Sequence, residues 1–166
     1  MNVDTEILSR LNHLSDQMPD YAGYAVPHER GKSDRLVRDA LAAKLRSIHQ
    51  HIERALAEQV DQGVLHSLPL GERLKTRIDH LRQTIVSERL SDDALDDLEQ
   101  PDVSPSLPSV LLNIDHQLIE AASNLEASVR QMAVQTRINP ESLQGIHNQI
   151  EELQRMFHDR RRLCEI

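Results

Sequence analysis

The sequence contains no tryptophan, one phenylalanine and two tyrosines among 166 residues. Nucleic-acid-binding modules stack bases on aromatic side chains, so this composition leaves little material for such a surface. The charge balance points the same way, because 19 Lys and Arg oppose 27 Asp and Glu. The resulting net charge of −8 repels phosphate backbones. We therefore expect nucleic acid to be an unlikely partner.

The chain has a single cysteine, Cys164, which cannot form an internal disulfide bond and fits a reducing compartment. The longest apolar runs are three or four residues, whereas a membrane-spanning helix needs roughly 20. Asp4 and Glu6 lie at the start of the chain, where there is no apolar h-region, so we expect no secretory signal. These features predict a cytoplasmic protein without a membrane partner.

Glycine and proline are scarce, with five and seven residues, and nearly all of them fall between segments of helical period. Because both residues destabilise helix interiors, this distribution predicts an all-α chain. No segment alternates with a period of two over a useful length, so we expect no sheet. Apolar residues recur at spacings of three and four in five segments, which we expect to be helices: residues 3–18, 33–62, 69–90, 108–137 and a last segment from 140.

Capping signals mark several helix ends. Ser33 is expected to cap the second helix, and Gly63 to follow its last turn in the left-handed conformation. Asn139 and Pro140 predict the start of the last helix, since asparagine caps free amides and proline suits the first helical position. Gly145 lies inside that helix, at a cost of about 1 kcal/mol relative to alanine. A close helix crossing is the explanation that we consider for it.

A short acidic helix is expected at residues 91–100, with Ser91 as its cap. The stretch from 92 to 102 contains six acidic residues and no basic one. The following residues, 101–108, are rich in proline and serine and should form an irregular linker.

Narrow apolar seams joined by short loops predict an antiparallel helical bundle of about four long helices plus one or two short ones, with coiled-coil-like seams. We expect a single domain over residues 1–166. Its parts are an N-terminal helix and loop (1–32), a helical hairpin plus the short acidic helix (33–100), the linker (101–108) and a second helical hairpin (109–166). Such a slim bundle exposes much surface, so we expect it to form a homodimer along an exposed seam.

Histidine is abundant, with nine residues, and three of them precede a glutamate by four positions. These pairs are His49/Glu53, His116/Glu120 and His147/Glu151. Residues four apart share a helix face, so each pair presents one imidazole and one carboxylate to a metal ion. His49 and His147 flank the seams, whereas His116 is assigned to a position facing water. The metal hypothesis therefore uses His49, Glu53, His147 and Glu151, and solvated side chains at the flanks are the alternative.

Two further sets of residues are candidates for partner binding. One consists of basic residues of the last helix, Arg155, Arg160, Arg161 and Arg162, with the acidic residues Asp92, Asp93, Asp96 and Asp97. The arginines either complement the negative end of their helix or bind an acidic partner, such as the acidic segment of a second copy. The other set is Tyr21 and Tyr24, in a loop-forming stretch. They either contact a partner or cover the open end of the bundle.

No arrangement of nucleophile, base or paired carboxylates stands out. The sequence therefore predicts a non-enzymatic interaction module, such as an adaptor, scaffold or regulatory subunit, which acts through helix–helix packing and needs no cofactor. Its expected partner is a protein, including a second copy of itself. A helical bundle that binds a metal or small ligand through His/Glu pairs is the alternative. A nucleic-acid accessory protein that uses the arginine-rich C-terminal segment is the weaker one.

Overall fold

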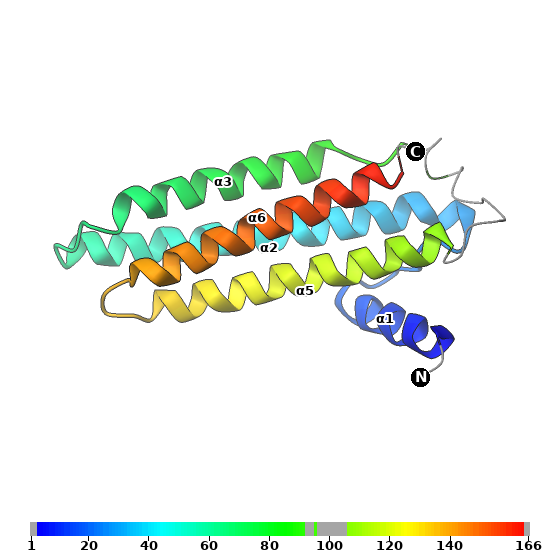
Figure 1. Cartoon of the computed structure of the whole chain (residues 1–166), viewed down its shortest axis with the longest axis horizontal. Coiled ribbons are helices and arrows are strands. Elements are labelled where there is room, and N and C mark those ends of the chain that lie inside the picture. Colours follow the sequence, from blue (N-terminus) through cyan, green and yellow to red (C-terminus); the bar gives the residue numbers. More distant parts are fainter. Residues whose placement is uncertain (1–2, 92–94, 96–105, 165–166) are drawn as a thin grey trace.

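The computed structural model describes residues 3–91, 95 and 106–164, and the regular structure within them is entirely helical (Figure 1). The helices are α1 (Val3–Gln17), α2 (Arg30–Asp61), α3 (Leu68–Ser87), α5 (Leu107–Ala133) and α6 (Pro140–Arg162), and a 3₁₀ turn, η1 (Pro27–Glu29), leads into α2. The predicted all-α class is confirmed. The short helix expected at residues 91–100 and most of the linker lie outside the described residues. None of the described helices is both long enough and apolar enough to span a bilayer.

Helices α2, α3, α5 and α6 form a four-helix bundle, and α1 packs against α5 (Figure 1). Consecutive helices form two antiparallel hairpins, α2–α3 and α5–α6. The hairpins meet so that α2 lies beside α5 and α3 beside α6, and within each of these two pairs the helices run in the same direction. At one end of the bundle, called the polar end below, α2 and α5 start while α3 and α6 finish. The opposite end, where short loops close both hairpins, is called the hairpin end.

One apolar core runs through the bundle, and the predicted seams supply most of it. The buried seam residues are Val37, Leu41, Leu45, Ile48 and Ile52 of α2, Leu74, Ile78, Leu81 and Ile85 of α3, Leu118, Ala122, Leu125, Val129 and Met132 of α5, and Leu143, Ile146, Ile150, Leu153 and Phe157 of α6. Near the end of α2, Val60 is exposed, and the neighbouring Gln59 is buried instead. The Gln59 amide donates to the Thr136 carbonyl at 3.1 Å and accepts from the Ile138 amide at 3.2 Å. A polar side chain therefore fixes the α5–α6 loop to the end of α2.

The helix ends agree with two of the capping predictions. Gly63 has a φ of 72°, and the Asn139 side chain accepts from the Glu141 amide at 2.9 Å. The predicted cap at Ser33 is wrong, because η1 leads into a helix that already starts at Arg30. Ser33 is buried inside α2, and its hydroxyl has no hydrogen-bond partner among the described residues.

The close helix crossing lies at Gly71 of α3 and not at Gly145. A Cβ atom built on Gly71 would lie 2.5 Å from Cδ2 of Leu56 on α2, and both residues are buried. A Cβ atom on Gly145 would meet no other atom within 4 Å. The explanation considered for Gly145 is therefore wrong, and this glycine only weakens its helix.

We expect Gly71→Ala to lower the free energy of unfolding by about 1–3 kcal/mol, because the Leu56 side chain must move within a packed core. Gly145→Ala should instead raise it by about 0.5–1 kcal/mol, since alanine favours the helix and has room. Urea unfolding followed by far-UV circular dichroism compares the two variants. Changes of the same sign in both would contradict this account of the crossing.

Candidate functional site

A cluster of polar side chains is buried at the polar end of the bundle. Tyr21, Tyr24, Asp34, Asp115 and Arg160 are each at most 4% exposed. Asp34 comes from the start of α2, Asp115 from the first half of α5 and Arg160 from the last turn of α6, while the tyrosines precede η1. The parallel arrangement of α2 and α5 brings these residues to the same end.

Arg160 lies at the centre of this Arg160 cluster. Its Nε donates to Asp115 Oδ1 at 2.6 Å, its Nη1 to Asp34 Oδ1 at 2.8 Å and its Nη2 to the Tyr24 hydroxyl at 2.6 Å. Asp115 Oδ2 accepts from the hydroxyls of Tyr21 and Tyr24 at 2.9 and 2.7 Å. Burial opposes the charged guanidinium, but the carboxylates of Asp115 and Asp34 outweigh it and hold the pKa of Arg160 above its ordinary value.

Two further arginines extend the cluster to the remaining elements. Arg38 donates through Nε to Asp34 Oδ2 at 2.9 Å and through Nη1 to the Val86 carbonyl at 3.1 Å, at the end of α3. Arg30 donates through Nε to the Tyr24 carbonyl at 2.8 Å and through Nη1 to the Leu95 carbonyl at 2.7 Å. The cluster therefore connects the N-terminal loop to all four helices of the bundle, which is a structural role.

Some of the predicted partner-binding residues are buried in the structure, and others lie on its surface. The burial of Tyr21 and Tyr24 agrees with the alternative interpretation, in which they cover the open end of the bundle. Arg160 is equally inaccessible. Arg161 Nη1 lies 2.9 Å from Glu88 Oε2 at the end of α3, and Arg162 is exposed.

Arg155 is exposed and pairs with Glu152 and Asp159 of its own helix. Its charge is therefore already balanced along α6. The acidic candidates Asp92, Asp93, Asp96 and Asp97 lie outside the described residues.

The two His/Glu pairs of the metal hypothesis lie in separate places. His49 Nε2 is 3.2 Å from Asp79 Oδ2 on α3, and Glu53 is exposed. His147 and Glu151 contact Arg77 instead, whose Nη1 is 3.1 Å from both ring nitrogens and whose Nη2 is 3.2 Å from Glu151 Oε1. A guanidinium there repels a metal cation. Within the described residues, these His/Glu pairs form no common metal-binding group.

A group with the geometry of metal ligands does occur among the described residues. It joins His13 of α1 to His116 and Glu120 of α5, with one donor atom of each within 4.8 Å of the others. Burial lowers the pKa of His116, and the charges of His13 and Arg10 act in the same direction against that of Glu120. The sequence contains the His116/Glu120 pair, but nothing in it showed that α1 brings a second histidine.

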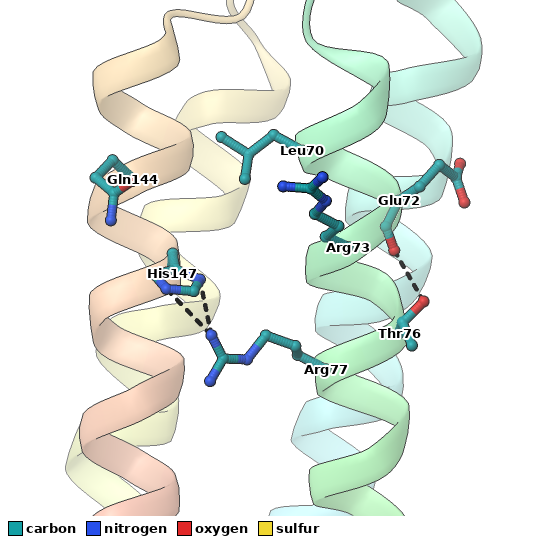
Figure 2. A pocket seen from close by; sticks show the side chains of 7 residues that line it. All are labelled: Leu70, Glu72, Arg73, Thr76, Arg77, Gln144 and His147. Carbon is teal, nitrogen blue, oxygen red and sulfur yellow. Dashed lines mark hydrogen bonds between the residues drawn. The ribbon is translucent and has the colours of Figure 1, made fainter.

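A groove of about 580 Å³ opens between α3 and α6 towards the hairpin end. Its lining consists of Leu70, Glu72, Arg73, Thr76 and Arg77 of α3 with Gln144 and His147 of α6. Figure 2 shows Leu70 and Arg73 reaching into the gap, and Arg77 extending across it to His147. Two guanidinium groups, those of Arg73 and Arg77, therefore line the groove, and Arg77 is already paired with Glu151.

A signal in the sequence could have revealed the Arg160 cluster. The apolar seam of α5 passes from Leu111 to Leu118, and Asp115 fills the seam position between them. Asp34 and Arg160 extend the seams of α2 and α6 by one further position at the same end of the bundle. Charged residues at the seam positions of three helices indicate a buried ionic cluster.

Comparison of the chain with protein-family models, with curated proteins and with solved structures finds no match. The argument for each candidate site therefore rests on the geometry of this chain alone.

Proposed function

We propose that this chain is a non-enzymatic, cytoplasmic protein-interaction module that binds an acidic amphipathic helix of a partner protein in the groove between α3 and α6. The observation that carries the proposal is the combination of an apolar side chain, Leu70, with the basic side chains of Arg73 and Arg77 in one groove. An acidic helix with leucine-like residues on one face complements this surface in charge and in hydrophobicity.

The size of the groove favours this mode of binding. A volume of about 580 Å³ accommodates a few side chains rather than a whole helix. In helix-in-groove recognition, apolar anchors on one face of the bound helix enter the groove while its backbone stays outside. Because α3 and α6 run in the same direction on either side, a third helix can lie along them as bundle helices do.

The ion pairs around the groove leave one arginine ready for an acidic ligand. Arg73 is exposed and forms no ion pair with any described residue. Glu72 also lines the groove, but Figure 2 shows its side chain pointing away from the gap, and its carboxylate is 3.0 Å from Lys75 Nζ. An incoming carboxylate can therefore pair with Arg73 without breaking an existing ion pair.

A labelled peptide of alternating leucine and glutamate clusters tests the proposal. The peptide, roughly 15 residues long so that it can form a helix, carries its leucines on one face. We expect micromolar affinity by fluorescence anisotropy, and a loss of about tenfold, or 1.4 kcal/mol, in Arg73→Glu. The matched control is Arg46→Glu, which makes the same charge change at an exposed position of α2 outside the groove.

The outcomes separate the possible occupants. No binding of the acidic peptide, or equal binding by both variants, would overturn the proposal. A peptide with lysine in place of glutamate should bind more weakly than the acidic one. Light scattering measures whether the chain is a homodimer and so tests a second copy as the occupant of the groove. A homodimer that dissociates in Arg73→Glu and persists in Arg46→Glu would show that the chain fills its own groove.

A further inference from the structure

Helix α1 is held to the rest of the protein by few apolar contacts. It packs against α5, where Leu14 is fully buried and Ile7 and Leu11 are only partly covered. Leu8 of the same helix is 57% exposed. An additional link between α1 and α5 would therefore add to the free energy that keeps α1 docked.

The side chains that face each other across this contact include three metal-binding groups. His116 and Glu120 lie one turn apart on α5, and the ring of His13 on α1 is 5.0 Å from that of His116, centroid to centroid. His116 Nδ1 and Glu120 Oε2 are 3.5 Å apart. Two ligands of a tetrahedral zinc ion are separated by about 3.4 Å when the metal–ligand bonds are about 2.1 Å. This pair is thus already spaced as one edge of a zinc tetrahedron.

The surroundings suit a bound cation. The side chain of His116 is only 16% exposed, while Glu120 and His13 are exposed and have freedom to complete the site. Gln17 Nε2 lies 2.8 Å from His13 Nε2 and donates to it, so His13 gives up this contact if Nε2 is the nitrogen that binds the metal. The positive charge of Arg10 reaches His116 and opposes a cation there, but Arg10 pairs with Glu6 of its own helix, which offsets that charge.

We propose that His13, His116 and Glu120 bind one zinc ion, which fastens α1 to α5. Two imidazole nitrogens and a carboxylate oxygen are a usual donor set for Zn²⁺, and three protein ligands leave a fourth position for water. The site lies at the α1–α5 contact, away from the groove between α3 and α6, so it does not depend on the proposed function.

Isothermal titration calorimetry with ZnCl₂ on protein without a polyhistidine tag tests the site. We expect one zinc ion per chain, and cobalt in its place should give the visible absorption bands of a four-coordinate ion. Zinc should also slow amide hydrogen exchange in α1 and leave α3 unchanged. His13→Ala should weaken zinc binding by about 100-fold, because loss of even an outer-shell partner typically costs 10–100-fold.

The matched control is His49→Ala, which breaks a His/Glu pair of the same spacing on α2 and should leave zinc affinity unchanged. His116→Gln, checked by circular dichroism, provides a second ligand variant that preserves the shape of a half-buried side chain. Absence of zinc binding, or equal binding by His13→Ala and the native chain, would overturn the proposal. Arg73→Glu should retain full zinc affinity, so failure of peptide binding and failure of metal binding are separate results.

Discussion

Replacing Arg160 with leucine is expected to lower the free energy of unfolding by about 3–5 kcal/mol. The substitution leaves the carboxylate of Asp115, which is completely buried, without its counter-charge. It removes one of the two arginines that pair with Asp34 within the described part of the chain. It also removes the donor to the Tyr24 hydroxyl. Single domains are stable by about 5–15 kcal/mol, so this one change should bring the chain close to unfolding. Urea unfolding followed by far-UV circular dichroism measures the effect.

The neighbouring arginine provides the control. Arg162 is exposed, so Arg162→Leu should change the free energy of unfolding by no more than about 0.5 kcal/mol. Arg160→Lys keeps the charge but lacks the forked donors that reach three acceptors at once, and we expect an intermediate loss. A loss in Arg160→Leu no larger than that in Arg162→Leu would contradict the central position of Arg160.

The apolar pattern predicted the helices because each seam is a local property of its own segment. Spacings of three and four define the buried faces of α3 and α6 without knowledge of their neighbours. Capping works over a few residues, so Asn139 and Gly63 could be interpreted correctly. The end of α5 was predicted less well, because a distant residue forms hydrogen bonds with the backbone there. The helix ends at Ala133, before the predicted end near 137, and the loop that follows is hydrogen-bonded to Gln59 of α2.

Local patterns mark some residues of the candidate sites, such as the charged residues at seam positions, but they do not show which of them come together. Arg160 and Asp34 are 126 residues apart, and their contact exists only because α2 starts where α6 finishes. Within the sequence, Arg160 belongs to a run of three arginines, and nothing marks it as the buried member except its position on the seam. The same limit applies to His13. Its helix lies beside α5 because of the conformation of the loop that follows it, and no local pattern in the sequence predicts that conformation.

The Arg160 cluster also explains why the hairpins combine in this order. Four similar apolar seams can pack in more than one arrangement with comparable burial. Any arrangement that separates the end of α6 from the starts of α2 and α5 leaves Arg160, Asp34 and Asp115 buried without partners, or forces them into solvent. The desolvation penalty of these charges therefore disfavours the alternatives, and the two tyrosine hydroxyls complete the set of partners.

Alkaline pH should destabilise the protein through the two tyrosines of this cluster. Burial raises the pKa of Tyr21 far above the ordinary value of about 10, and Asp115 adds to the effect. Burial also raises the pKa of Tyr24, against the opposing charge of Arg160. Both hydroxyls stay protonated in the folded chain, whereas the unfolded chain loses both protons as the pH rises through about 10. The contribution is therefore fully present below that pH and is lost above it. Between about pH 9 and pH 11 the free energy of unfolding should fall by about 2.7 kcal/mol.

The composition makes this prediction easy to measure. The chain has no tryptophan and only these two tyrosines, so tyrosinate absorbance in the near ultraviolet reports them alone. During an alkaline titration, that absorbance should rise together with the loss of helical circular dichroism, and not before it. Tyr21→Phe removes one of the two titrating groups and should halve the pH dependence, while Tyr24 still donates to Asp115. Full ionisation near pH 10, the ordinary value, with the helices intact would mean that the hydroxyls reach solvent in the folded state and would contradict the buried cluster.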